Sequence, residues 1–361
     1  MNALTFHAGP RALAHIRAKG LRAADIAIIP AAAGGPKGLI FQSLDQWLFG
    51  TWLARAPRER TLIGSSIGAW RMAAACHADP VAAFARLGEL YVGQRYTAKP
   101  TRQDINDVCQ RLLGDFVGGF EDEVVNHPHY RLNLLTVRGL RSLSAPAHQR
   151  AEMAGFALAA MHNLASRERL SAMLERVVMS DGRGAPPWLQ QGFDRFTTRF
   201  ATLDAGNLGA ALLASGTLPL IMQPVQCIAG APPGHYWDGG IIDYHLALPY
   251  ARMAPGELVL YPHFTEHIVP GWLDKAMPWR RAARGANRAW LDNVLIVAPS
   301  REFLETLPRR KLPDRKDFAH YGLDHDQRIL KWQQAICEGQ RLRDAFAEFA
   351  QAPDLARIVP I

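Results

Sequence analysis

Three short stretches of the chain combine residue types that could carry out acyl transfer. The first is Gly64-Ser65-Ser66-Ile67-Gly68. It follows an apolar run at 61–63 and precedes an alanine-rich stretch at 69–75, which predicts a strand, a sharp turn and a helix. Its two glycines lack the Cβ atoms that would clash in so tight a turn. Ser66 would lie at the apex, above a helix N-terminus whose free N–H groups favour negative charge. We interpret the stretch as a nucleophile elbow.

The second stretch could stabilise the oxyanion that a serine nucleophile creates. Gly34-Gly35-Pro36-Lys37-Gly38 joins an apolar run at 25–30 to a helical pattern at 39–48. Backbone N–H groups of a glycine loop are suitable donors because no side chain blocks approach. We expect Gly34 and Gly35 to act together with the N–H of Ile67. Phosphate binding is not expected, because Leu39 and Ala33 break the Walker and dinucleotide patterns.

The third stretch offers a carboxylate as the base. Asp238-Gly239-Gly240 follows a predicted strand at 234–237, and its glycines permit close approach of another backbone. Histidine is the more usual partner of a serine nucleophile. The available histidines are His127, His129, His235, His245, His263, His267, His320 and His325. Both types of base remain candidates at this point.

The remaining pattern is α/β throughout, without internal repeats. Further strands are expected at 130–137, 199–203, 258–262 and 294–297, and helices at 147–176 and 208–215. Residues 1–20 are expected to form a surface helix. The apolar residues of the 147–176 helix favour burial in the core, with an acyl pocket or a lid as alternatives.

Composition describes an ordinary globular protein of 361 residues. No stretch approaches the roughly 18 consecutive apolar residues of a transmembrane helix, and we expect a cytoplasmic protein. The cysteines are too scattered for a zinc site, so no metal is expected. The net charge of +8 favours anionic partners.

A basic segment near residue 280 mixes cations with tryptophan. It contains Trp279, Arg280, Arg281 and Arg284. This mixture is typical of a membrane interface, so we expect peripheral contact with an anionic membrane and none with nucleic acid. The alternative is a solvated face whose tryptophans pack inward.

Taken in order, the three stretches resemble the motifs of the patatin-like phospholipases. The similarity covers about residues 24–250 and includes two weaker features, residues 214–219 and Asp243 with Pro249. It implies a three-layer αβα fold with a mainly parallel central sheet. It also implies one domain over 1–361, whose basic helical extension at 270–361 packs on the core.

The resemblance further implies a Ser66–Asp238 dyad that hydrolyses fatty acyl esters, such as phospholipid or lysophospholipid, without a cofactor. Lys37, Gly38, Gly64, Gly68, Gly239 and Gly240 would support the motifs. Ala33 replaces the first loop glycine and Pro36 has no N–H to donate, which leaves Gly34 and Gly35 as the main loop donors. Two alternatives are a Ser-His-Asp hydrolase that uses His320 or His325, and a non-catalytic basic protein that binds lipid surfaces.

Overall fold

A single central sheet organises the protein. The computed structural model describes residues 2–282 and 285–361. Its described residues form the strands β1 (Leu4–Ala8), β2 (Ile26–Ala31), β3 (Arg60–Ser65), β4 (Tyr130–Gly139), β5 (Leu174–Ser180), β6 (Thr198–Thr202), β7 (Tyr236–Asp238), β8 (Leu258–Pro262), β9 (Val294–Pro299) and β10 (Ile358–Pro360).

The sheet is mostly parallel. Its order is β10-β1-β9-β8-β2-β3-β4-β5-β6, and β7 pairs with β4 outside this path. The antiparallel pairs are β1 with β9, β4 with β5, and β4 with β7. The central strands β9, β8, β2, β3 and β4 are all parallel to their neighbours in that run. This arrangement confirms the predicted fold class.

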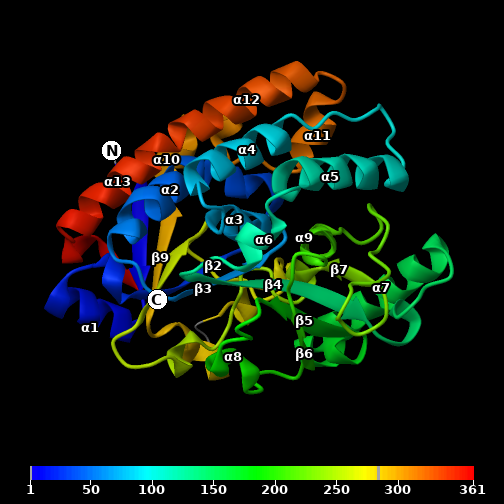
Figure 1. Cartoon of the computed structure of the whole chain (residues 1–361), viewed down its shortest axis with the longest axis horizontal. Helices are drawn as coiled ribbons and strands as arrows, with labels where there is room; N and C mark the ends of the chain where they lie inside the picture. The colour runs from blue at the N-terminus through cyan, green and yellow to red at the C-terminus, as the bar shows by residue number, and fades with distance from the viewer. Residues whose placement is uncertain (1, 283–284) are drawn as a thin grey trace.

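Helices cover both faces of the sheet, which gives three layers (Figure 1). Above the sheet in that view lie α2, α3, α4, α5, α12 and α13, and below it lie α1 and α8. The helices are α1 (Pro10–Lys19), α2 (Gln42–Trp47), α3 (Ile67–Ala75), α4 (Pro80–Val92), α5 (Arg102–Val117), α6 (Glu121–Val125), α7 (Gln149–Ala165), α8 (Pro187–Gln190), α9 (Leu208–Gly216), α10 (Arg301–Thr306), α11 (Lys316–Tyr321), α12 (His325–Glu338) and α13 (Gln340–Gln351).

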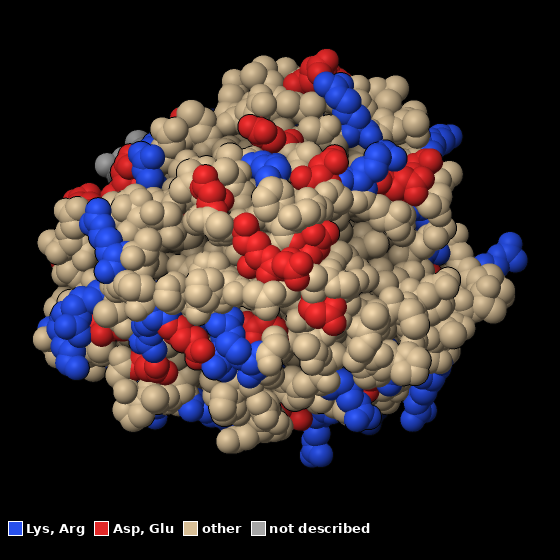
Figure 2. All heavy atoms as spheres, viewed as in Figure 1, with Lys and Arg blue, Asp and Glu red and all other residues tan. Residues whose placement is uncertain are grey.

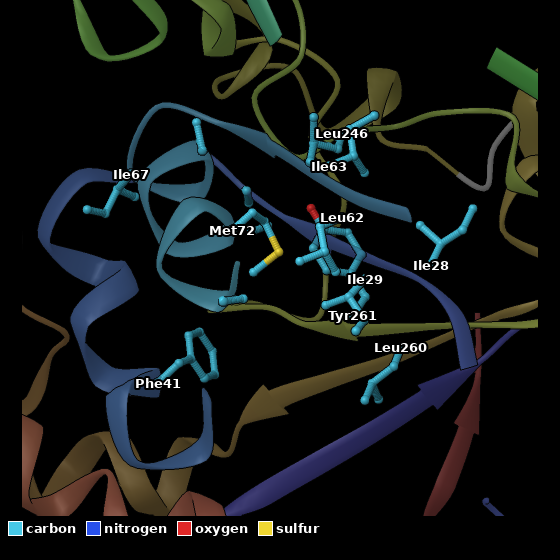
Figure 3. Packing of buried hydrophobic residues seen from close by; sticks show 14 of the residues in the cluster. Ile28, Ile29, Phe41, Leu62, Ile63, Ile67, Met72, Leu246, Leu260 and Tyr261 are labelled. Carbon is cyan, nitrogen blue, oxygen red and sulfur yellow. The ribbon is translucent and has the colours of Figure 1, made fainter. Parts of the chain in front are cut away.

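The core packs around the central parallel strands, which are apolar on both faces as strands between two helical layers must be. Ile28, Ile29, Leu62 and Ile63 are all fully buried. Figure 3 shows Met72 of α3 lying close to these strands, so the helix that begins at the predicted elbow is anchored directly to the sheet. This packing of α3 on the sheet holds Ser66, at the start of the helix, in a fixed position.

Strands β3 and β7 share one side of β4 and run toward each other. The first half of β4 pairs with β3 in parallel, up to Ser65 opposite Leu135. The second half pairs with β7 in antiparallel fashion, beginning with Asp238 opposite Thr136. Because Leu135 and Thr136 are consecutive, the carboxyl ends of β3 and β7 meet there. This register brings two residues together that are far apart in the sequence.

Several sequence predictions about the edges of the sheet were wrong. Residues 1–20 begin with β1, in which Leu4, Phe6 and Ala8 are buried, before α1 starts. The predicted helix at 147–176 ends at Ala165, and β5 starts at Leu174. Strand β5 was missed because its polar residues Glu175 and Arg176 are buried in ion pairs. The predicted extension contains helices α10 to α13, and it also supplies β9 and β10 to the same sheet.

Candidate active site

The turn between β3 and α3 is a strained elbow with Ser66 at its apex. Ser66 has a φ of 57°, in the left-handed region that residues with side chains rarely adopt. Its N–H donates to the hydroxyl of Ser215 at 2.9 Å, and that hydroxyl donates to the carbonyl of Leu135 at 2.6 Å. The buried pair of hydrogen bonds holds the strained residue in place.

The two glycines that flank the serine are required by close packing. A methyl group on Gly68 would collide with the carbonyl oxygen of Ala31, at the end of β2. A methyl group on Gly64 would lie 2.5 Å from the backbone of Gly68 across the turn. Helix α3 can therefore approach the sheet only because both positions lack a Cβ atom.

Ser66 and Asp238 are in direct contact. The Ser66 hydroxyl donates a hydrogen bond of 2.7 Å to Oδ2 of Asp238. The other carboxylate oxygen accepts the N–H of Gly240 at 2.7 Å. The backbone N–H of Asp238 donates to the carbonyl of Thr217 at 2.7 Å, which holds the main chain that carries the carboxylate. The structure thus brings together the two residues that the sequence analysis paired.

Burial alters the acidity of the carboxyl group. Asp238 is 5% exposed, and loss of solvation raises its pKa above the ordinary aspartate value. The nearby Arg315 charge, the hydrogen bonds from Ser66 and Gly240, and Lys275 act in the opposite direction. The carboxylate is therefore a better proton acceptor than an aspartate in water, which suits a general base.

No histidine among the described residues hydrogen-bonds to Ser66 or Asp238. His325 lines the cavity in front of Ser66, but its Nε2 forms a hydrogen bond of 2.8 Å with the carbonyl of Tyr96. His245 and His263 are buried beside each other, with ring centroids 4.3 Å apart, beneath Phe264. The geometry therefore offers Ser66 a carboxylate partner and no imidazole.

The glycine loop presents free backbone donors. The N–H groups of Gly34, Gly35 and Ile67 have no acceptor among the residues that the structure describes. Gly35 has a φ of 58°, which favours glycine, and a Cβ atom on Gly34 would lie 2.6 Å from the ring of Phe264. Ala33 cannot serve as a donor because its N–H bonds to the carbonyl of Tyr244.

Pro36 and Lys37 fit this loop without loss of a donor. Pro36 lies in the first turn of a short helix over 35–41, where its missing N–H would have no helical partner. The ammonium group of Lys37 lies 4.8 Å from the centre of the Phe264 ring. Gly38 lets the loop pack closely on Ile67 and Arg71. The loop therefore keeps Gly34 and Gly35 available beside the elbow.

An apolar cavity of about 510 Å³ opens in front of Ser66. Helices α3, α4, α5, α9, α11 and α12 and the loops beside them supply its walls. Apolar lining residues include Ile67, Trp70, Ile105, Leu218, Met222 and Phe318. A cavity of this size and character accommodates an extended hydrocarbon or an aromatic group.

A second cavity of about 300 Å³ adjoins the first on the side of Asp238. The two share Leu218 and Arg315 as lining residues, so the dyad lies at their junction. The second cavity is cationic. Lys37, Lys275 and Arg315 line it, and none of them forms an ion pair with any residue of 2–282 or 285–361.

The lysines of this cationic cavity are held beside aromatic rings. The ammonium group of Lys275 lies 4.1 Å from the centre of the Tyr244 ring and 5.5 Å from that of Trp272. Partial desolvation and the charges of Lys37 and Arg315 lower the pKa of Lys275 to about 8. Desolvation also lowers the pKa of Lys37. The carboxylates of Asp238 and Asp314 also line the cavity, but its four basic side chains outnumber them, so the cavity favours an anionic ligand.

Sequence reasoning missed Lys275 and Arg315 as site residues. Both belong to the C-terminal third, outside the motifs, and their only signal was the basic character of that region. Within the described residues, no cluster of three or more His, Cys, Asp or Glu side chains could hold a metal ion.

The segment predicted to contact a membrane has mixed surroundings. Trp279 is 68% exposed, whereas Arg280 forms an ion pair of 2.9 Å with the buried Asp274. Arg281 is half-buried, and Arg284 lies outside the described residues. Arg280 therefore has an internal role, and membrane contact through this segment stays a prediction. No helix among the described residues is long and apolar enough to cross a bilayer.

Comparison with known proteins gives only distant structural similarity. No family model and no curated protein sequence matches this chain. Among solved structures, the chain is similar to human GIVD cytosolic phospholipase A2, with 10% sequence identity and a TM-score of 0.35. The alignment covers 96% of this chain and 62% of that structure, so the chain spans less than two thirds of its length. A likeness at this level carries no functional argument, and the assignment below rests on the site.

Proposed function

We propose that the protein is a serine acyl hydrolase that uses a Ser66–Asp238 dyad. The observation that carries this proposal is the 2.7 Å hydrogen bond from the Ser66 hydroxyl to a buried carboxylate, at the junction of an apolar and a cationic cavity. The strained elbow and the unused N–H groups of Gly34, Gly35 and Ile67 support it. The motif resemblance to patatin-like phospholipases points the same way.

The mechanism follows from this geometry. Oγ of Ser66 attacks the ester carbonyl carbon while Oδ2 of Asp238 takes the hydroxyl proton. The free backbone N–H groups receive the oxyanion. Asp238 then gives its proton to the leaving alcohol as the C–O bond breaks, which leaves an acyl group on Ser66. Water attacks that acyl group, Asp238 accepts the water proton, and the proton returns to Ser66 as the fatty acid departs.

The two cavities indicate the type of ester. The apolar cavity on the Ser66 side suits the acyl chain, and the cationic cavity on the Asp238 side suits an anionic leaving group. Among fatty acyl esters, phospholipids and lysophospholipids combine these two parts. We therefore propose an acyl ester with a phosphate-bearing leaving group as the substrate.

A probe that labels activated serines tests the proposal. A fluorophosphonate should label the wild-type protein at Ser66, as located by peptide mapping. Ser66→Ala and Asp238→Asn should each lower hydrolysis of p-nitrophenyl esters by at least about 10³-fold, because each removes one half of the reacting pair. Circular dichroism should report unchanged folding for both variants.

The histidine variants His320→Gln and His325→Gln discriminate against a Ser-His-Asp triad. Both should retain most of the esterase activity. Loss of activity to the level of Ser66→Ala in either variant would contradict the dyad. Labelling at Ser65, or at no serine, would contradict the assigned nucleophile.

A further inference from the structure

Helix α7 exposes its apolar side to solvent. Met153, Leu158, Met161 and Leu164 are 55%, 39%, 61% and 69% exposed. Together with three exposed alanines, these residues form a surface that we call the α7 face. It consists of Met153, Ala154, Ala157, Leu158, Met161, Leu164 and Ala165. Their spacing of three and four places them on one side of the helix, and none of them is charged. In Figure 2, the right-hand flank where Figure 1 labels α7 is mostly uncharged.

The opposite side of α7 buries its polar residues. Glu152 is 3% exposed and pairs with Arg102 at 2.8 Å. Asn163 is 1% exposed and donates to the carboxylate of Asp274 at 3.0 Å. A surface helix normally has the reverse arrangement, with its apolar stripe toward the core. These buried contacts fix the orientation of α7. The prediction that its apolar residues form core was therefore wrong for the four exposed residues, whereas Phe156 packs against the buried Trp237.

The N-terminal end of α7 lies near the apolar cavity. Oε1 of Glu152 accepts the backbone N–H of Leu220 at 3.1 Å, which places the first turn of α7 beside Ile221. Ile221 is 46% exposed and lines the cavity, as does Leu323, which is 63% exposed. The first turn of α7 therefore lies next to the segment that carries Ile221, an exposed apolar residue at the cavity in front of Ser66.

The other end of α7 lies near the segment that carries Trp279. Arg280 donates to the carbonyl of Leu164 in the last turn of α7, which brings the exposed neighbour Trp279 beside the helix. Tryptophan at the margin of an apolar surface suits the headgroup level of a bilayer.

Charged residues border the α7 face and are mostly basic. From residue 141 to 170, the exposed charged side chains are Arg141, Arg150, Glu168 and Arg169. In a twofold dimer through α7, the arginines of the two copies would be brought close to one another. Anionic lipid headgroups would neutralise them instead, in agreement with the net charge of +8.

We propose that the α7 face lies on the surface of an anionic lipid bilayer, so that acyl chains pass from the bilayer into the cavity of Ser66. The membrane contact itself needs only the surface described above. Its role in supplying substrate rests on the proposed function.

Vesicle flotation with the full chain tests the contact. Wild-type protein should bind vesicles made of phosphatidylcholine and phosphatidylserine in equal parts. The double variant Met161→Glu, Leu164→Glu should bind at least about tenfold more weakly, because two carboxylates would enter the interface. Both substitutions are at exposed helical positions that tolerate glutamate, so the fold should be unchanged. Leu330→Glu, at a position 47% exposed on α12, is the matched control and should bind like wild type.

Parallel assays separate this proposal from the enzymatic one. The double variant should hydrolyse the monomeric ester p-nitrophenyl butyrate like wild type, yet lose activity on phospholipid in vesicles. If wild type is inactive on both esters, the proposed function fails while flotation still decides the membrane contact. Unchanged vesicle binding by the double variant would overturn the contact. So would a wild-type dimer that becomes monomeric in the double variant without any change in vesicle binding.

Discussion

Asp238 meets two demands that oppose each other. As the proposed base, it must be ionised to accept the proton of Ser66, yet it is buried where charge is disfavoured. Its pKa is raised by burial, and the positive charge of Arg315 limits that rise. A guanidinium from a distant part of the chain therefore helps to keep the base in its active form.

Replacement of Arg315 should change the pH dependence of activity. Activity requires the carboxylate, so it should fall as the pH falls through the raised pKa of Asp238. Arg315→Gln removes a charge that lowers this pKa, and the acid limb of kcat/KM should move to higher pH. A neutral p-nitrophenyl ester is the substrate of choice, because it does not need the cationic cavity. A shift to lower pH, or no shift, would contradict the coupling.

Lys275 should give a separate, alkaline limb. Its pKa of about 8 means that it loses its charge as the pH rises through this value. For an ester with an anionic leaving group, KM should rise above about pH 8, whereas a neutral ester should show no such limb. Lys275→Gln lacks this charge at every pH, so KM for the anionic ester should be raised throughout and the alkaline limb should disappear. Lys19→Gln, at an exposed position on α1, is the control, and an unchanged limb in Lys275→Gln would exclude this group.

Helix α3 and strand β2 touch through Gly68 without an intervening side chain. This close packing can be predicted from the sequence because the elbow motif is local. Its strand, glycine, serine and helix follow one another within 16 residues, from Arg60 to Ala75. The orientation of helix α7 could not be predicted in the same way. Its apolar spacing is that of a core helix, and only the distant partners Arg102 and Asp274 determine which side faces inward.

Gly68→Ala should damage both the elbow and the fold. The added methyl group would push α3 away from Ala31, which should cost about 1–3 kcal/mol of unfolding free energy or more. Esterase activity should fall with it, since α3 carries Ser66 at its N-terminus. Urea denaturation and p-nitrophenyl ester hydrolysis measure the two effects.

Gly114→Ala is the matched control for this substitution. Gly114 lies in α5, and a Cβ atom there would meet nothing within 4 Å. The change should stabilise the protein by about 0.5–1 kcal/mol and leave activity unchanged. Equal stability of the two alanine variants would show that the close approach of α3 and β2 is unimportant.

The two ends of the described chain join in the same edge of the sheet. Strand β10 pairs with β1, with Phe6 opposite Ile358, and the ring of Phe349 on α13 stacks on that of Phe6 at 3.7 Å between centroids. The C-terminal third thus packs on the N-terminal strand and also supplies Lys275 and Arg315 to the site. The motifs between 24 and 250 predicted the reacting pair, but these cations depend on long-range packing that no local pattern encodes.

Phe349→Ala should loosen this C-terminal packing. The residue is 1% exposed, so its truncation should lower the free energy of unfolding by about 3–5 kcal/mol. Limited proteolysis should then cut within α13 before other helices. Leu330→Ala on the exposed side of α12 should change stability by less than about 0.5 kcal/mol. Equal proteolytic resistance of both variants would contradict the anchoring role of Phe349.

The meeting of β3 and β7 beside β4 also sets an order of events during synthesis of the chain. Asp238 follows Ser66 by 172 residues, so the ribosome releases the nucleophile well before its base. Strands β3 and β4 can already pair while β7 is still untranslated, because the half of β4 that β7 needs stays open. Ser66 is therefore synthesised well before the carboxylate that its hydroxyl contacts. The proposed dyad is complete only when β7 pairs with the remaining half of β4.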